Sequence, residues 1–261
     1  MNVYFDNAAT TPIRTEVIQV ISSVMENCFG NPSSVHSYGR TAKTNLETSR
    51  KGIAAALNAA PQEIIFTSGG TESDNMILHS AVKDLGVKTI ISSSIEHHAI
   101  LHAMDALKLL HGIEVLFVNL LDDGSIDLKN LAFLLQKDTS KKLVSLMHVN
   151  NEIGTVLDLA KVGRICHQHN AFFHSDTVQS IGKFEFNLHE LPIDFIVASA
   201  HKFHGPKGVG FAYVKKGTVL QPMLYGGEQE KGLRAGTEAI HQIVGMTKAL
   251  EISYKNLEVE S

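Results

Sequence analysis

Short apolar runs alternate with longer amphipathic stretches along most of this 261-residue chain. Runs of this length, rich in Ile, Val and Phe, are typical of buried parallel strands, and the stretches between them have the apolar spacing of helices. This alternation predicts a three-layer αβα sandwich, in which helices cover both faces of a mostly parallel sheet. The runs expected as strands are EIIFTS (63–68), KTIISSS (88–94), EVLFV (114–118), KLVSLMHV (142–149), AFFHSD (171–176), DFIVASA (194–200) and GVGFAYVK (208–215).

Helices are expected before, between and after these strands. In the first of them Thr15 is expected as the N-cap, and Gly30 as the stop signal. The expected helical stretches are 15–28, 41–59, 72–86, 98–112, 127–137, 158–170 and 250–261.

Composition and charge favour an ordinary soluble globular protein. The chain is 44% hydrophobic and 19% charged, with a net charge of −4, so nothing favours nucleic acid or an anionic membrane as a partner. No apolar run approaches the length of a membrane span, and MNVYFDNAATTP lacks a signal-peptide pattern. Two cysteines, Cys28 and Cys166, do not suggest a disulfide framework, and we expect a cytoplasmic protein. In CHQH (166–169) only Cys166 and His169 share a helix face, so no metal site is expected.

Polar clusters directly follow five of the expected strands. In a parallel sheet the carboxyl ends of the strands meet at one edge, and ligands bind there. We therefore expect these clusters to form one site. They are TSGGTESDN, SSIEHHA, HVNNEIG, SDTVQS and SAHKFHGPKG.

The first cluster has the composition of an anion site. In SGGTES (68–73) two glycines allow close approach of the backbone, and the following helix presents free N–H groups. The alternative is a plain N-cap by Ser68 or Thr71. The segment is not a nucleoside-triphosphate loop, because the Gly-Lys-Ser/Thr ending is absent. HGPKGVG lacks it too, since no Ser or Thr follows Lys207.

Four side chains in the other clusters have a functional and an ordinary interpretation. Asp176 could pair with a protonated ring nitrogen, or could be an N-cap or turn aspartate. Gln179 and Asn151 could donate to a phenolate oxygen, or bond to loop backbone. His97, at an expected helix start, could stack on a flat ring or move protons, or could be a surface or capping residue.

Lys202 follows the apolar run DFIVA directly. It could be a surface lysine at a strand end, or a lysine held for covalent chemistry with a carbonyl group. An anion site, an aspartate for a pyridinium, amides for a phenolate, a stacking histidine and a lysine are together the groups that bind pyridoxal phosphate (PLP). The combination predicts PLP as the cofactor, covalently held by Lys202.

Several multi-residue motifs then identify a family. The chain resembles the NifS/IscS-type cysteine desulfurases of the class V aminotransferases over nearly its whole length. The resemblance implies the large domain of the fold-type I PLP-dependent transferases and a homodimer. It also implies conversion of L-cysteine to L-alanine, with the sulfur passed to an enzyme cysteine as a persulfide for iron–sulfur cluster and thiocofactor assembly. Sulfur-acceptor or iron–sulfur scaffold proteins would then be partners. The motifs are YFDNAATTP, FGNPSSVHSYG, FTSGGTESDN, EHHAI, HVNNEIGTV, HSDTVQSIGK, SAHKFHGPKGVG and GGEQEKGLRAGTEAIHQIVG.

The resemblance also assigns roles to individual residues. Lys202 matches the Schiff-base lysine, which also carries a proton on the substrate. His97 matches the histidine stacked over the cofactor ring, a candidate acid–base group. Asp176 would pair with the pyridine nitrogen. The other assigned cofactor-binding positions are Gln179 and Asn151 near the phenolic oxygen, Gly70, Thr71, Ser199 and His201 at the phosphate, Ala200 beside them, and Thr237 at the phosphate of the other subunit.

One departure concerns the sulfur acceptor. In the family the acceptor cysteine and the arginine for the substrate carboxylate lie in a C-terminal small domain, and neither Cys28 nor Cys166 stands in a GSAC- or GHHC-like context. The sequence therefore resembles the large domain alone, with an N-terminal segment (1–14), a PLP-binding domain (15–245) and the start of a helix leading toward a small domain (246–261). By itself such a chain should be inactive or impaired in sulfur transfer. A selenocysteine lyase, a cysteine sulfinate desulfinase and a noncatalytic PLP-binding dimerisation module remain as alternatives.

Overall fold

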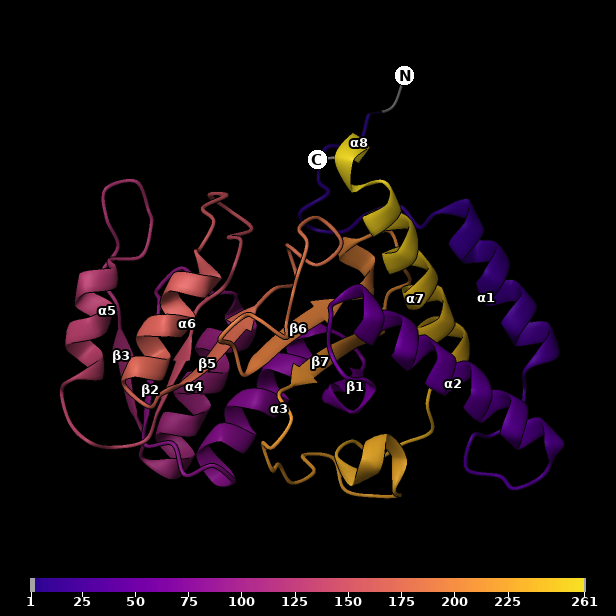
Figure 1. Ribbon diagram of the computed structural model, residues 1–261, viewed down its shortest axis with the longest axis horizontal. Coiled ribbons are helices and arrows are strands. Elements are labelled where there is room, and N and C mark those ends of the chain that lie inside the picture. The colour runs from indigo at the N-terminus through magenta and orange to yellow at the C-terminus, as the bar shows by residue number, and fades with distance from the viewer. Residues whose placement is uncertain (1–2, 261) are drawn as a thin grey trace.

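A seven-stranded sheet forms the centre of the computed structural model, which describes residues 3–260 (Figure 1). The strand order is β1-β7-β6-β5-β4-β2-β3. Every predicted strand is present, and nearly all strand residues are buried except in the edge strand β3. The strands are β1 (Ile64–Thr67), β2 (Thr89–Ser92), β3 (Glu114–Phe117), β4 (Lys142–Ser145), β5 (Phe172–Asp176), β6 (Phe195–Ser199) and β7 (Gly210–Val214).

The sheet is mostly parallel, as the alternation predicts. Strands β3, β2, β4, β5 and β6 pair in parallel in that order. Strand β7 pairs antiparallel with both β6 and β1, so β1 points the same way as the other parallel strands. The loop between β6 and β7, which carries Lys202, is too short for a parallel crossover, and β7 therefore returns beside β6.

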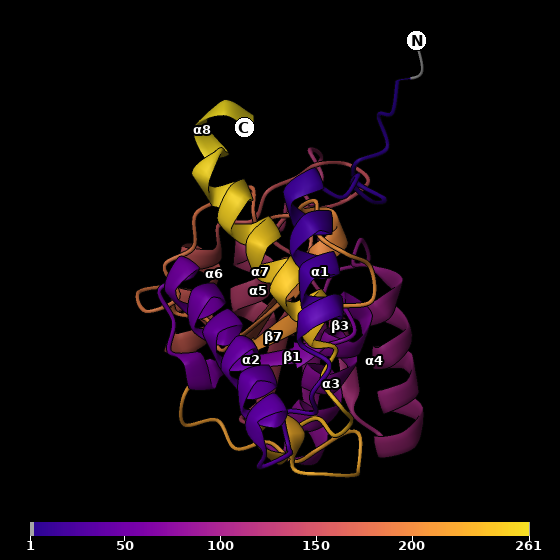
Figure 2. The same cartoon turned by 90° about the vertical axis from the view of Figure 1, so that its right-hand side faces the viewer.

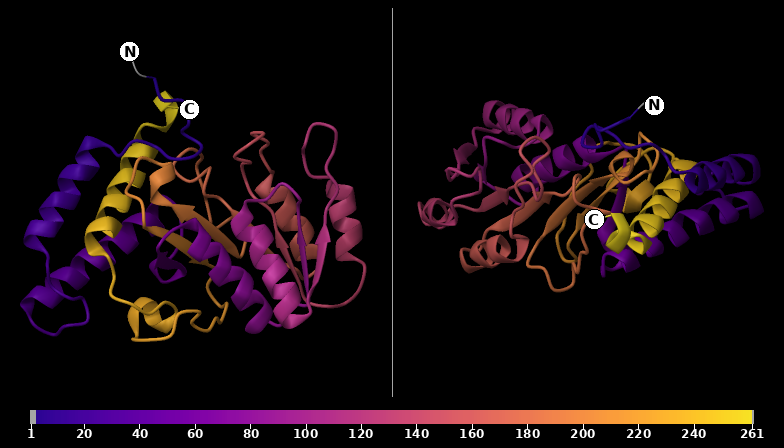
Figure 3. Two further views of the ribbon diagram at one scale, coloured as in Figure 1. Left: turned by 180° about the vertical axis from the view of Figure 1, so that it is seen from behind. Right: turned by 90° about the horizontal axis from the view of Figure 1, so that it is seen from above.

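Helices cover both faces of the sheet, which confirms the αβα sandwich. Successive strand residues point to opposite faces, so Ile90 packs in the core under α3 and α4, and Ile91 in the core of the other face. Figures 1 and 3 show these two faces, and Figure 2 shows α1, α2 and α7 together at the β1 end. The α-helices are α1 (Thr15–Asn27), α2 (Ser37–Ala56), α3 (Gly70–Lys83), α4 (His98–His111), α5 (Leu128–Leu135), α6 (Leu159–Gln168), α7 (Ile240–Lys255) and α8 (Leu257–Glu260).

Some helix ends differ from the sequence expectation. Thr15 is the first helical residue of α1, not its N-cap, which is Arg14. Gly30 lies beyond the helix end, and a Cβ there would stand 2.3 Å from the carbonyl oxygen of Tyr38, so this glycine serves close packing rather than termination. Helix α2 begins earlier than expected because the side chain of His36 accepts the Gly39 N–H and caps it.

Helix α7 begins at Ile240 and continues past residue 246, so the domain boundary expected there falls inside a helix that packs on α1 and α2. Of the helices formed by residues 3–260, none combines the length and apolarity needed to cross a membrane.

Candidate active site

The polar clusters meet in a cavity of about 480 Å³ at the carboxyl ends of the parallel strands. A cavity of this size suits a small-molecule ligand. Two predicted site residues do not line it: Ala200, between Ser199 and His201, is fully buried, and Thr237 lines a separate cavity together with Cys28. The predicted residues that do line the active-site cavity are Gly70, Thr71, His97, Asn151, Asp176, Gln179, Ser199, His201 and Lys202.

The start of α3 forms one wall of this cavity. Its N-cap is Gly69, with φ +150°, and neither Ser68 nor Thr71 caps the helix as the alternative interpretation required. A Cβ on Gly70 would stand 2.7 Å from Val178 Cγ2, so only glycine fits between the helix start and the loop after β5. The first-turn N–H groups of α3 are therefore available to an anion in the cavity, such as a phosphate.

Asp176 ends β5, lines the same cavity and is 6% exposed. Burial raises the pKa of its carboxyl group, while the Val178 N–H at 2.9 Å from Oδ1 and the charges of His97 and Lys202 lower it. The aspartate is thus both a turn residue and a buried carboxylate facing the cavity, where a ligand cation would be a favourable partner.

Lys202 enters the cavity from the loop after β6. Its Nζ donates hydrogen bonds to the carbonyl oxygens of Ala8 and Ala9 in the N-terminal segment, the latter at 2.9 Å. Burial lowers the pKa of this amine, and the carboxylates of Asp176 and Asp6 partly oppose that shift. A lowered pKa increases the fraction of neutral, nucleophilic amine, which covalent chemistry with a carbonyl group requires.

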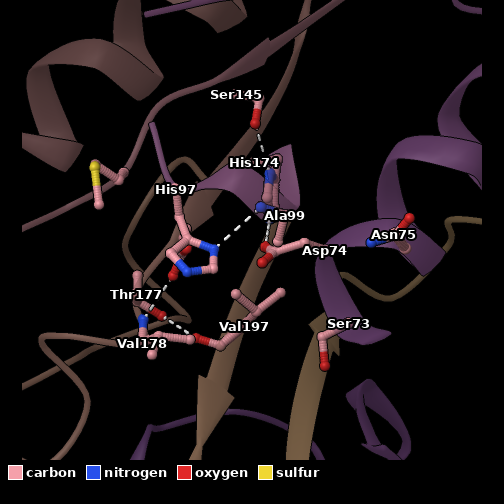
Figure 4. Close-up of polar contacts among 12 residues, drawn as sticks. Ser73, Asp74, Asn75, His97, Ala99, Ser145, His174, Thr177, Val178 and Val197 are labelled. Atoms are coloured by element: carbon pink, nitrogen blue, oxygen red, sulfur yellow. Dashed lines mark hydrogen bonds and ion pairs between the residues drawn. The ribbon is translucent and has the colours of Figure 1, made fainter. Parts of the chain in front are cut away.

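His97 is the N-cap of α4, as the sequence predicts for a helix start. Its Nδ1 accepts the Ala99 N–H at 3.1 Å (Figure 4), which leaves Nε2 as the protonated nitrogen of the neutral ring. Both predicted amides are hydrogen-bonded within the chain: Gln179 Nε2 donates to Ala8 O of the N-terminal segment at 2.8 Å, and Asn151 Nδ2 donates to the neighbouring Glu152 Oε1 at 2.6 Å. Gln179 therefore bonds to the backbone, as the ordinary interpretation expects, and also lines the cavity.

Sequence reasoning missed several polar groups at this site. Asp74 lines the cavity from α3, and Glu96 and His174 are buried next to it. His174 stands two residues before Asp176 and hence on the same face of β5, and Asp74 lies one turn into the helix after the glycines. These two spacings are the sequence features from which Asp74 and His174 could have been predicted as part of the site.

Neither cysteine lines the active-site cavity. Cys166 is buried on α6, and burial raises the pKa of its thiol. Within residues 3–260, moreover, no group of three or more His, Cys, Asp or Glu side chains could hold a metal ion.

The model of the family described as aminotransferase class V matches residues 3–261. The chain belongs to this family. As a class V aminotransferase it is 44% identical, over 99% of its length, to the cysteine desulfurase IscS of Dictyoglomus turgidum. It spans about 65% of the length of that relative.

Solved structures of this class V aminotransferase's relatives share its fold. A NifS-like protein matches with a TM-score of 0.95 and 41% identity, over 99% of this chain and 71% of the other. SspA in complex with cysteine matches with a TM-score of 0.90 and 34% identity, over 96% of this chain and 72% of the other. The fold is therefore the α/β fold of NifS-like proteins.

Proposed function

We propose that this class V aminotransferase is a PLP-dependent cysteine desulfurase, which converts L-cysteine to L-alanine and passes the sulfur to a cysteine thiol as a persulfide. The observation that carries the proposal is a single cavity that joins an open helix N-terminus, the buried Asp176 and Lys202. The printed names of the relatives support the reaction, and the relative solved with cysteine supports the substrate.

The residues of the cavity fit PLP. The glycine-lined start of α3, with Ser199 and His201, would hold the phosphate, and Asp176 would hold the pyridine nitrogen. When bound, the cofactor supplies an electron sink for charge that develops at the substrate α-carbon. Lys202 is placed to hold the cofactor covalently.

Two side chains are placed to move protons. The amine of Lys202, with its lowered pKa, can hold the proton of the substrate α-carbon and return it. His97 offers Nε2 to the cavity, since its Nδ1 is engaged by the Ala99 N–H. Sulfur release requires a proton at the sulfur or at the remaining carbon, and His97 is the second group that could supply it.

The proposal extends to the assembly and the partners. We propose a cytoplasmic homodimer in which Thr237 contributes to the phosphate site of the other subunit. The persulfide sulfur would go to acceptor or iron–sulfur scaffold proteins. Cys28 and Cys166 lie outside the cavity, so neither is proposed as the acceptor.

The test is to locate the cofactor on the chain. Protein purified with PLP should show the visible absorption band of a lysine-bound cofactor, and borohydride reduction with peptide mapping should place the pyridoxyl group on Lys202. Lys202→Ala should abolish the band, while Lys207→Ala, a change at an exposed lysine of the same loop, should retain it. Labelling of Lys183 or Lys207 instead of Lys202 would contradict the assignment.

A further inference from the structure

A buried histidine–carboxyl pair lies beside the cavity and has no part in the roles described above. His174, on β5, is fully buried, and Asp74, on α3, is 1% exposed. His174 Nε2 and Asp74 Oδ1 face each other at 3.5 Å (Figure 4). Among residues 3–260 neither atom has a hydrogen-bond partner. Groups buried this deeply require a partner, which points to a proton shared between these two atoms.

The pair continues on the far side of the imidazole ring. His174 Nδ1 lies 2.9 Å from Ser145 Oγ on the neighbouring strand β4. Asp74 itself lines the cavity, together with Asp176. The side chains of Ser145, His174 and Asp74 therefore form a continuous chain of polar contacts from the interior of the sheet to the cavity wall.

Two proton arrangements satisfy this chain of contacts. If Asp74 is ionised, it accepts the Nε2–H of His174, and Nδ1 accepts the hydroxyl proton of Ser145. If Asp74 is protonated, it donates to Nε2, and the Nδ1–H donates to Ser145 Oγ. The two arrangements place the ring proton on opposite nitrogens.

The surroundings favour the protonated carboxyl group. Burial and the neighbouring carboxyl groups of Asp176 and Glu96 raise the pKa of Asp74, and burial lowers the pKa of His174 to about 3. Asp176 differs, because the Val178 N–H donates to its Oδ1, and His97 and the Lys202 amine oppose the rise of its pKa. Of the two carboxyl groups, Asp176 is the one with groups that support ionisation.

We propose that Asp74 is protonated at neutral pH and donates to His174 Nε2, so that Asp74 and His174 act as a neutral positioning pair beside the ionised Asp176. One carboxylate charge would then face one pyridinium, a consequence that rests on the proposed function. A second charge on Asp74 would repel Asp176 and also attract the cation. The proton arrangement itself does not depend on cofactor binding.

The direct test is ¹⁵N NMR of the full chain labelled at histidine, with His174 assigned through His174→Gln. Between pH 6 and 8 we expect a neutral His174 ring with the proton on Nδ1 and an unprotonated Nε2. The neutral variant Asp74→Asn can donate its amide N–H to Nε2 and should keep this tautomer. A proton on Nε2, or a charged ring, would overturn the proposal. If His174→Gln does not fold, Ser145→Ala gives the assignment by the shift at Nδ1.

A second measurement uses PLP itself. In Asp74→Asn the pH midpoint of the visible cofactor band should stay within about 0.3 pH units of the unmodified chain, because no charge has been removed. A shift of about one unit or more would show that Asp74 is ionised and would overturn the proposal. A chain that binds no PLP would contradict the proposed function, and the NMR result would still decide the protonation of Asp74.

Discussion

At the scale of single residues, Glu96 is a buried carboxyl group beside the site. It directly precedes His97 in the sequence and is 6% exposed. Its Oε1 accepts hydrogen bonds from Ser93 Oγ at 2.8 Å and from the Met147 N–H at 3.0 Å. Its Oε2 is buried without a hydrogen-bond partner among the described residues. Burial raises the pKa of Glu96 to about 8, because the hydrogen bonds do not offset the cost of a desolvated charge.

This raised pKa makes stability depend on pH. The folded chain keeps the Glu96 proton while the unfolded chain loses it, so Glu96 lowers the free energy of unfolding as the pH rises from about 5 to 8, by about 1.4 kcal/mol per unit. Glu96→Gln cannot titrate. We expect its stability relative to the unmodified chain, measured by urea unfolding at several pH values, to increase with pH over this range.

The exposed substitution Glu26→Gln is the matched control, and its stability difference should change little with pH. A Glu96→Gln difference that is as independent of pH as this control would contradict the prediction.

The residues predicted from sequence share one property. Asp176 ends a strand, Lys202 lies in the short loop after one, and His97 caps a helix that follows one, so the strand direction brings all three to one edge of the sheet. Asp74 and His174 lie inside a helix and a strand, and only the packing of α3 on β5 buries them together. No local sequence pattern reports that packing.

At the scale of structural elements, Thr11 connects the N-terminal segment to the loop that carries Lys202. Its N–H and its Oγ1 both donate to the His201 carbonyl oxygen, at 2.9 and 2.8 Å, and Oγ1 accepts the His204 N–H at 2.7 Å. Three hydrogen bonds to residues on both sides of Lys202 fix the direction from which this lysine enters the cavity. The same segment provides the carbonyl oxygens that bind Lys202.

Thr11→Val keeps the shape of the side chain and removes its hydroxyl group. The His204 N–H then loses its acceptor, which costs roughly 1–3 kcal/mol. We expect the free energy of unfolding to fall by about this amount and limited proteolysis at the N-terminal segment to become faster. Thr15→Val, at an exposed threonine of α1, should change neither quantity comparably. Equal behaviour of the two variants would exclude this role for Thr11.

Element types were more predictable than their connections. The sequence predicts all seven strands, because buried strands of this sheet are continuous apolar runs between helical stretches. It treats residues 1–14 as a separate segment, although Thr11 bonds to residues about 190 positions later. Contacts over that distance depend on the completed sheet, and the helix starts at Thr15 and Ser37 depend on local capping and packing details.

At the scale of the whole molecule, the position of Thr237 bears on whether the site is complete within one chain. Thr237 is exposed and lies outside the active-site cavity of its own chain. Its loop is nevertheless held firmly. Arg50 forms two hydrogen bonds of 2.7 Å with the buried Glu230, and Arg234 pairs with Glu72 at 2.7 Å in the first turn of α3. A fixed loop that presents a hydroxyl group outward is suited to complete a site on another molecule.

The surface near Thr237 has the character of an interface. Phe29 and Tyr38 are 74% and 58% exposed with ring centroids 4.9 Å apart, and Phe29 lines the same cavity as Thr237. Exposed apolar side chains that gather in this way favour association with another protein surface. A second copy of the chain is the partner that the proposed function requires.

We therefore predict that sedimentation near neutral pH shows a homodimer, and that Thr237→Ala weakens PLP retention. The loss of a hydrogen bond to a charged phosphate costs roughly 1.5–3 kcal/mol, so equilibrium dialysis should show a dissociation constant raised by about tenfold to a hundredfold. Thr139→Ala, at an exposed threonine between α5 and β4, is the control and should leave PLP binding unchanged. A monomeric chain whose Thr237→Ala variant binds PLP as tightly as the unmodified chain would show that each site is complete within one subunit. That result would rule out a contribution of Thr237 across the interface.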